Sequence, residues 1–126
     1  MSVSDHYIAF VQDLLADFAP LRIKRMFGGA GVYSGDLFFA ILVEDNLYLK
    51  VDDGNRAAYQ DRGIQPFVYE GKDGRRETMS YYPVPPELLD DPDALAPWAR
   101  QAIDAAQRTA AKQARSGRKA PGSGRR

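Results

Sequence analysis

Residues 21–51 read LRIKRMFGGAGVYSGDLFFAILVEDNLYLKV. Apolar and polar residues alternate here between turn residues, which is typical of short antiparallel strands. The run Leu37–Val43 is apolar on both pleats, as in a central strand that is covered on both faces. Glycines interrupt the pattern at residues 28–31, and acidic turn residues do so at residues 44–46. The stretch therefore predicts a meander of three or four antiparallel strands, with the glycines forming either a tight turn between strands or a bulge in a bent sheet.

Helical periodicity marks both ends of the folded region. Apolar residues predict a first helix over about residues 5–18, capped by Ser4 and ended by Pro20. A last helix follows the acidic residues 90–93, and Pro97 is expected in or just before its first turn, because an interior proline is unfavourable. The apolar stripe of this last helix consists of Leu95, Trp98, Ala102, Ile103 and Ala106.

Between the meander and the last helix, the sequence predicts a short helix and a hairpin. The helix covers about residues 54–62 and is capped by Asp52 or Asp53. The hairpin joins strands over residues 67–70 and 77–82. The complete order predicts an α+β domain, with helices packed on one curved antiparallel sheet.

Charge divides the 126-residue chain at residue 107. Residues 1–107 carry seventeen acidic and ten basic side chains, a net charge of −7, whereas residues 108–126 carry seven basic and no acidic side chains. The chain is therefore expected to be a folded, acidic domain over 1–107 with a basic flexible tail over 108–126. Such asymmetry is a feature of proteins with nucleic-acid or acidic partners.

Composition removes several classes of function. The chain has no cysteine and one histidine, which argues against a disulfide scaffold, a thiol nucleophile and a zinc site. No apolar run approaches the roughly 20 residues of a membrane-spanning helix, and the N-terminus lacks the features of a signal peptide. We expect a cytoplasmic protein without membrane contact.

Each candidate for catalysis has a simpler structural reading. A phosphate-binding loop opens a helix, whereas the glycines at 28–31 lead into a further strand. The paired carboxylates at 44–45, 52–53 and 90–91 occupy turns and helix starts, where aspartate is favoured, and His6 is expected on the surface. The sequence thus predicts no catalytic residue, no cofactor and no metal site, and the protein is not expected to be an enzyme.

Two groups of basic residues are candidates for contact with nucleic acid or a protein partner. They are Arg22, Lys24 and Arg25 in the first strand, and Arg108, Lys112, Arg115, Arg118, Lys119, Arg125 and Arg126 in the tail. Strand alternation places Arg22 and Lys24 on one face, where they form either a solvated surface or a binding surface. The tail could neutralise several phosphates, and it could equally keep the acidic domain soluble.

Three segments form a combined pattern, which reads RMFGGAGVY at 25–33, LYLK at 47–50 and SYY at 80–82. The residues of this fold motif are Met26, Phe27, Gly28, Gly29, Gly31, Tyr48, Lys50, Tyr81, Tyr82 and Trp98. The pattern resembles the N-terminal domain of the TfoX/Sxy competence regulators over about residues 5–107. The resemblance implies an α-β3-α-β2-α fold similar to type III secretion chaperones.

Full-length members of that family are implicated in inducing competence genes, as co-activators that work with the cyclic-AMP receptor protein. They carry a second, helical C-terminal domain, whereas a short basic tail follows residue 107 here, so a stand-alone domain is expected. The resemblance implies a non-enzymatic transcriptional co-regulator that contacts DNA or a protein such as a transcription factor. The alternatives are a homodimeric, chaperone-like protein that binds a partner polypeptide, and a small enzyme or ligand-binding domain with a cleft near residues 28–31.

Overall fold

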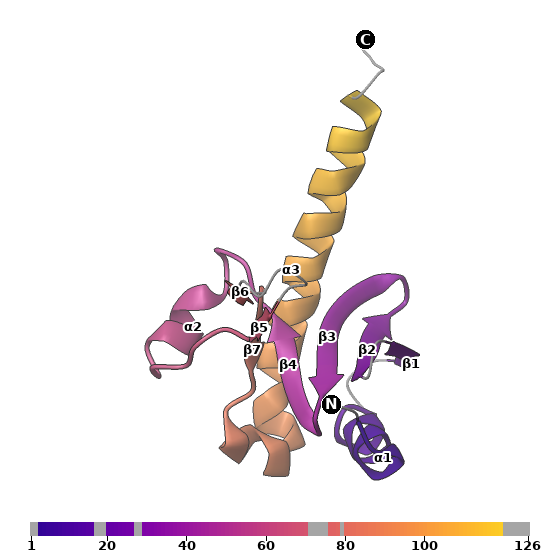
Figure 1. The fold of residues 1–126 in the computed structure, drawn as a ribbon, viewed down its shortest axis with the longest axis vertical. Coiled ribbons are helices and arrows are strands. Elements are labelled where there is room, and N and C mark those ends of the chain that lie inside the picture. The colour runs from indigo at the N-terminus through magenta and orange to yellow at the C-terminus, as the bar shows by residue number, and fades with distance from the viewer. Residues whose placement is uncertain (1–2, 17–19, 27–28, 71–75, 79, 120–126) are drawn as a thin grey trace.

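The computed structural model describes residues 3–16, 20–26, 29–70, 76–78 and 80–119 (Figure 1). Its elements are α1 (Asp5–Leu14), β1 (Arg22–Met26), β2 (Gly29–Ser34), β3 (Leu37–Val43), β4 (Asn46–Lys50), α2 (Arg56–Gln60), β5 (Val68–Glu70), β6 (Arg76–Thr78), β7 (Tyr81–Pro83), the 3-10 helix η1 (Pro86–Asp90) and α3 (Pro92–Lys119). Figure 1 shows α1 and α3 beside the sheet, with the C-terminal half of α3 extending beyond it.

Five strands form one antiparallel sheet in the order β1-β2-β3-β4-β7. β3 is the central strand, as its two-sided apolar run predicted. A bulge between Val32 and Tyr33 shifts the register of β2 against β3, and such bulges bend a sheet. Because helices pack on this curved, open sheet, the predicted α+β fold class is confirmed.

Four strands precede α2 and three follow it among the described residues, one more in each group than the α-β3-α-β2-α order implied. The predicted strand over 77–82 divides because its two halves have different partners. β6 pairs with β5 in a separate two-stranded sheet, whereas β7 pairs with β4 in the main sheet. Near this change of partner, the Ser80 carbonyl accepts a hydrogen bond from the Val51 N–H, at 2.9 Å.

Two glycines of the run, Gly29 and Gly31, are not turn residues, while Gly28 lies outside the described residues. Gly29 and Gly31 lie inside β2, opposite Met26 and Lys24 of β1, and both are buried. A Cβ on Gly29 would lie 2.5 Å from the Leu42 carbonyl oxygen, so the glycine allows close approach of neighbouring backbones. Close approach within a sheet, rather than a turn conformation, is the physical reason for these glycines.

α1 ends earlier than predicted. Ser4 caps it as expected, since its Oγ accepts a hydrogen bond from the Tyr7 N–H at 3.0 Å. The helix ends at Leu14, four residues before the predicted end, although Leu15 is fully buried. The apolar periodicity indicates which side chains are buried, and buried side chains continue past the last helical residue. Pro20 therefore does not terminate α1.

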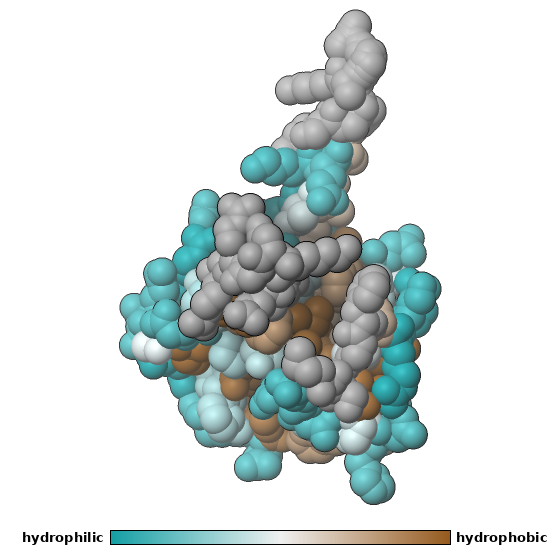
Figure 2. Space-filling view, in the orientation of Figure 1, coloured by the Kyte–Doolittle hydropathy of each residue, from teal (hydrophilic) through white to brown (hydrophobic). Residues whose placement is uncertain are grey.

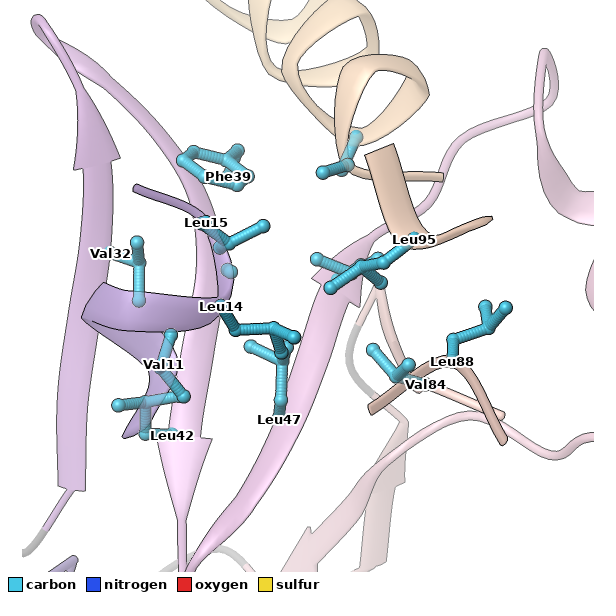
Figure 3. Close-up of a cluster of buried hydrophobic side chains, with 14 of the residues drawn as sticks. Val11, Leu14, Leu15, Val32, Phe39, Leu42, Leu47, Val84, Leu88 and Leu95 are labelled. Carbon is cyan, nitrogen blue, oxygen red and sulfur yellow. The ribbon is translucent and has the colours of Figure 1, made fainter. Parts of the chain in front are cut away.

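The main core lies between α1, the sheet and α3 (Figure 3). Val11 and Leu14 of α1, with Leu15 just after it, meet side chains from β2 and β3, and the cluster continues through η1 to α3. α3 packs against β3 and β4, with Leu95 fully buried. Burial of one such leucine stabilises a fold by roughly 1.5–3 kcal/mol, so this cluster fixes α1 and α3 relative to the sheet.

α2 is shorter than predicted, and its cap differs. Neither aspartate caps it: the residue before the helix is Asn55, which makes no capping hydrogen bond to α2. The buried Asn55 side chain instead accepts from the Asp52 N–H at 2.8 Å and donates to the Lys50 carbonyl at 3.1 Å. It therefore ties the start of α2 to the end of β4. Tyr59 then anchors the helix in a second cluster.

α3 begins before Pro97, not at it. Asp91 caps the helix by accepting a hydrogen bond from the Ala94 N–H, at 3.2 Å, and Pro92 occupies the first helical position, which suits proline. Pro97 consequently lies inside the helix, contrary to expectation. The helix runs on to Lys119, so residues 108–119, assigned to the tail, are helical. The functional division at residue 107 stays a prediction.

Candidate functional site

The LYLK and SYY segments lie side by side because β4 pairs with β7. Lys50 lies opposite Tyr81, and Leu49 lies opposite Tyr82. Side chains alternate across a strand, so Leu49 and Tyr82 enter the buried clusters while Lys50 and Tyr81 occupy the opposite pleat. Two parts of the fold motif, thirty residues apart, thereby form one surface.

The Lys50 ammonium has neutral partners. Its Nζ donates a hydrogen bond to the Ser80 Oγ at 3.0 Å and lies 5.2 Å from the centre of the Tyr81 ring. Burial lowers the pKa of Lys50 from its ordinary value, and nearby Asp52 partly opposes that shift. In the part of the chain that the structure describes, no carboxylate lies within ion-pair distance of this ammonium. Among the described residues, the group is therefore a half-buried cation without an ion-pair partner.

Aromatic rings extend from Tyr81 across the sheet. The Phe38 ring lies 5.8 Å from Tyr81 and stacks on Tyr33 at 5.0 Å, with 21° between the planes. The Arg22 guanidinium lies 4.8 Å from the centre of the Tyr33 ring, completing the row on β1. Burial, with a smaller contribution from Tyr33, raises the pKa of Tyr81 to about 12. The Tyr81 hydroxyl is therefore neutral throughout the physiological range.

A cavity of about 250 Å³ lies where this row meets α3. Lys50, Tyr81 and Phe38 form its sheet side, while Ala106 and Ala110 contribute the apolar part of the helix side. The remaining lining residues are Asp36, Leu37, Thr109 and Gln113. Figure 2 shows hydrophobic surface near the middle of the molecule and a mainly hydrophilic surface on the described part of the projecting helix.

The predicted basic cluster of β1 divides between two faces. Arg22 and Lys24 are exposed on one pleat, as predicted. Arg25 lies on the other, where its guanidinium donates to the Val3 carbonyl at 3.0 Å and forms an ion pair with Asp5. Arg25 thus ties β1 to the start of α1. The structure gives it a role within the fold, and the surface cluster reduces to Arg22 and Lys24.

Arg108 also has an internal partner. Its Nε and Nη2 donate to the two carboxylate oxygens of Asp52, at 2.6 and 2.7 Å. The same carboxylate accepts a hydrogen bond from the Gly54 N–H at 2.9 Å, and a Cβ on Gly54 would lie 2.6 Å from the Arg108 Nη2. The hydrogen bond from Arg108 is the main cause that lowers the pKa of Asp52. This two-pronged ion pair holds α3 against the β4–α2 loop.

Beyond Arg108, α3 carries further basic residues. Spacings of four, three and four residues place Arg108, Lys112, Arg115 and Lys119 along one helical face, which we call the basic face. Arg118 lies off this face. Lys112 is exposed and borders a hollow of about 450 Å³ together with Asp52 and Asp53. Arg125 and Arg126 lie outside the described residues.

The other residues of the fold motif serve mainly in packing. Trp98 meets Tyr59 edge-on at 4.9 Å, and Tyr59 in turn lies 5.2 Å from Tyr82. Tyr48 packs against the ring of Phe67 at 4.9 Å, and Met26 is half-buried at the end of β1. Phe27 and Gly28 lie outside the described residues.

Sequence reasoning missed both the Lys50 cavity and the Asp52–Arg108 pair. Lys50 was assigned to the fold motif alone, and Asp52 to a helix cap. Asp52 and Arg108 are 56 residues apart in the sequence, and no local sequence pattern predicts such a contact. The β4–β7 pairing could have been sought from two polar residues, since Lys50 ends β4 and Ser80 immediately precedes β7.

Across the described ranges, no group of three or more histidine, cysteine, aspartate or glutamate side chains is arranged to hold a metal ion. None of the helices that the structure describes has the length and apolar character to cross a membrane.

The matching family is that of the TfoX N-terminal domain, whose model aligns with residues 13–106. The aligned region runs from α1 to the middle of α3 and contains the whole sheet, with the sheet side of the Lys50 cavity and Ala106 of its helix side. A search of curated proteins found no match. Because the alignment covers three quarters of the chain and the described fold agrees with the expected α+β class, the chain belongs to the TfoX N-terminal domain family.

Proposed function

We propose that this protein is a non-catalytic regulatory domain that contacts nucleic acid through the basic face of α3. The family membership supports a regulatory domain. The observation that carries the nucleic-acid contact is the projection of α3 beyond the sheet (Figure 1), with basic residues repeated along one face. A helix with cations on one side can lie along a phosphate backbone or enter a major groove.

The ion pair with Asp52 gives Arg108 a positioning role. It fixes the direction in which α3 leaves the acidic domain, so Lys112, Arg115 and Lys119 are the proposed contact residues. These three lie within about 10 Å along the helix axis. Release of counterions by each phosphate contact makes such binding strongly dependent on salt.

Fluorescence anisotropy of a labelled DNA duplex tests this proposal on the full chain. The variant Lys112→Gln/Arg115→Gln is compared with the charge-matched variant Arg22→Gln/Lys24→Gln on β1. The helix variant is expected to bind at least about ten-fold more weakly, with a plot of log affinity against log salt less steep by about two. The strand variant is expected to change both quantities far less.

Absence of binding by the unaltered chain at low salt would rule out the proposal. An equal loss in the two variants would show that total charge, rather than the basic face, governs binding. Thermal unfolding of both variants provides the control for folding, because the described contacts of Arg22, Lys24 and Lys112 include no hydrogen bond or ion pair that supports the core.

A protein partner is the second candidate, favoured by the open edge of the sheet. β1 pairs only with β2 among the described strands, and an edge strand can accept an added strand. Two copies of β1 would bring Arg22 and Lys24 against like charges, which disfavours a homodimer through this edge. The chemistry of the edge fits an extended, acidic polypeptide.

An isotope-labelled chain distinguishes the two candidates. An extended peptide of alternating glutamate and valine is expected to shift the amide signals of β1 if strand addition occurs, while leaving those of α3 unchanged. Light scattering after size exclusion is expected to show a monomer. A stable dimer, or peptide-induced shifts confined to α3, would contradict strand addition at β1.

A further inference from the structure

We propose that the cavity between α3 and the end of the sheet binds a small molecule with one carboxylate attached to a flat, apolar ring. This site is separate from the basic face of α3, and its chemistry comes from Lys50, Phe38 and Tyr81. The inference does not depend on binding of nucleic acid.

The Lys50 ammonium favours a ligand that carries a carboxylate. Removing a cation from water is unfavourable unless an opposite charge or hydrogen bonds compensate for it. Lys50 is half-buried, and its described partners are the Ser80 hydroxyl and the face of the Tyr81 ring. An ammonium has three N–H donors, so Ser80 leaves capacity for a carboxylate oxygen. The lowered pKa of Lys50 agrees with incomplete compensation.

The aromatic and apolar side chains that line the cavity favour a flat, apolar ring in the ligand. Phe38 and Tyr81 present rings 5.8 Å apart and inclined at 42°, and Leu37, Ala106 and Ala110 add apolar surface. An aromatic ligand can pack against the protein rings in an edge or offset arrangement, which contributes beyond the area buried. The alanines matter because a larger side chain on this face of α3 would occupy the same space.

The size and the rim limit the ligand further. A volume of about 250 Å³ lies just below the roughly 300 Å³ at which pockets for drug-sized molecules begin, so a one-ring compound fits. Asp36, exposed in the β2–β3 turn, contributes a negative charge to the rim. That charge disfavours a doubly charged phosphate and favours a single carboxylate held at the Lys50 end.

Benzoate is a suitable probe, with benzamide as its neutral counterpart of the same shape. Each is titrated into the isotope-labelled full chain, and the amide signals of Phe38, Lys50, Tyr81 and Ala110 are followed by NMR. Benzoate is expected to shift these signals with a dissociation constant of about 1 mM, typical of so small a ligand. Benzamide is expected to bind at least about ten-fold more weakly.

Two variants locate the interaction. Lys50→Gln is expected to abolish the preference for benzoate, whereas Lys24→Gln, which makes the same charge change on β1, is expected to retain it. Ala110→Leu fills the cavity from an exposed helical position, so it is expected to weaken both probes without lowering thermal stability. This second variant keeps the test decisive should Lys50→Gln alter folding.

Three results would overturn the proposal. They are the absence of saturable shifts around the cavity, equal binding of benzoate and benzamide, and unchanged benzoate binding in both Lys50→Gln and Ala110→Leu. Asp36→Asn supplies a test of the rim: it is expected to tighten benzoate binding, and weaker binding would contradict the assigned repulsion. None of these measurements contains DNA, so they are independent of the proposed function.

Discussion

Gly29 and Gly31 lie two residues apart in β2 and are both buried, but a side chain would meet different obstacles at each. A Cβ on Gly29 would lie 2.5 Å from the backbone oxygen of Leu42, in the adjoining strand. A Cβ on Gly31 would lie 2.7 Å from the terminal methyl group of Met26 and 2.8 Å from the Phe38 ring. Methionine is flexible and can move, whereas the sheet backbone cannot move without disturbing its hydrogen bonds.

Gly29→Ala is therefore expected to destabilise the protein more than Gly31→Ala. We expect a loss of about 3 kcal/mol for Gly29→Ala and about 1 kcal/mol for Gly31→Ala, within the usual range for overpacking. Urea unfolding of both variants measures the difference. A larger loss at Gly31 would show that Phe38, rather than the Leu42 backbone, is the less yielding neighbour.

Tyr59 is almost completely buried, and its hydroxyl has no hydrogen-bond partner among the described residues. A buried, unpaired hydroxyl costs roughly 1–3 kcal/mol. Tyr59→Phe keeps the ring contacts with Trp98 and Tyr82 and removes that cost, so we expect about 1 kcal/mol of added stability. Thermal unfolding at neutral pH measures it, and a clear loss of stability would show that the Tyr59 hydroxyl makes a favourable hydrogen bond.

At the scale of elements, the contact between α3 and the β4–α2 loop depends on Asp52 and Arg108. A double-mutant cycle with Asp52→Asn and Arg108→Gln isolates their coupling. We expect about 1 kcal/mol, the upper part of the range for surface pairs, because the geometry is two-pronged and Asp52 is partly buried. A coupling near zero would mean that side-chain entropy cancels the attraction and that packing alone holds α3.

The same pair has a defined pH dependence. Arg108 holds the pKa of Asp52 below its ordinary value of 3.8 in the folded state, so the unfolded chain takes up a proton first as pH falls. The stabilisation is therefore fully present above about pH 5 and is lost as pH falls through the lowered pKa. The stability difference between the unaltered chain and Asp52→Asn is expected to shrink below pH 4, and a difference that grows there would contradict this sign.

At the scale of the whole molecule, the boundary suggested by charge does not coincide with a boundary in the fold. Composition changes after residue 107, but α3 is continuous to Lys119. Arg108, the first residue after the change, bonds to Asp52. The basic segment thus begins inside the folded unit. Its first cation, Arg108, bonds to the domain, and the next one, Lys112, is exposed.

Truncation provides the corresponding test. A chain ending at residue 107 is expected to lose about 1 kcal/mol of unfolding free energy, because it lacks the Arg108 partner of Asp52. A chain ending at residue 114 keeps that pair and is expected to match the full chain closely. Arg108→Gln in the full chain is the control and is expected to resemble the shorter truncation. Equal stability of all four chains would contradict the role given to Arg108.

Local sequence patterns predicted most of the helices and strands. The apolar run Leu37–Val43 identified the central strand, because only burial on both faces makes such a run favourable. Ser4 was identified as a helix cap from its position before an amphipathic segment. The predicted end of α1 was wrong because Leu15 is buried but not helical. The predicted start of α3 was wrong because the helix accommodates Pro97 in its interior.

The amino-acid sequence by itself determined the α+β class, the family pattern and the charge asymmetry, because these follow from residue order and composition. Tertiary structure alone decided which charges are available. It directed Arg25 to Asp5 and Arg108 to Asp52 and left Lys112 exposed. It also placed Lys50 beside a cavity, with no ion-pair partner in the described part of the chain. Residues separated by 20 to 56 positions meet only when the strands and α3 are packed, and that packing decides whether a charge supports the fold or faces a ligand.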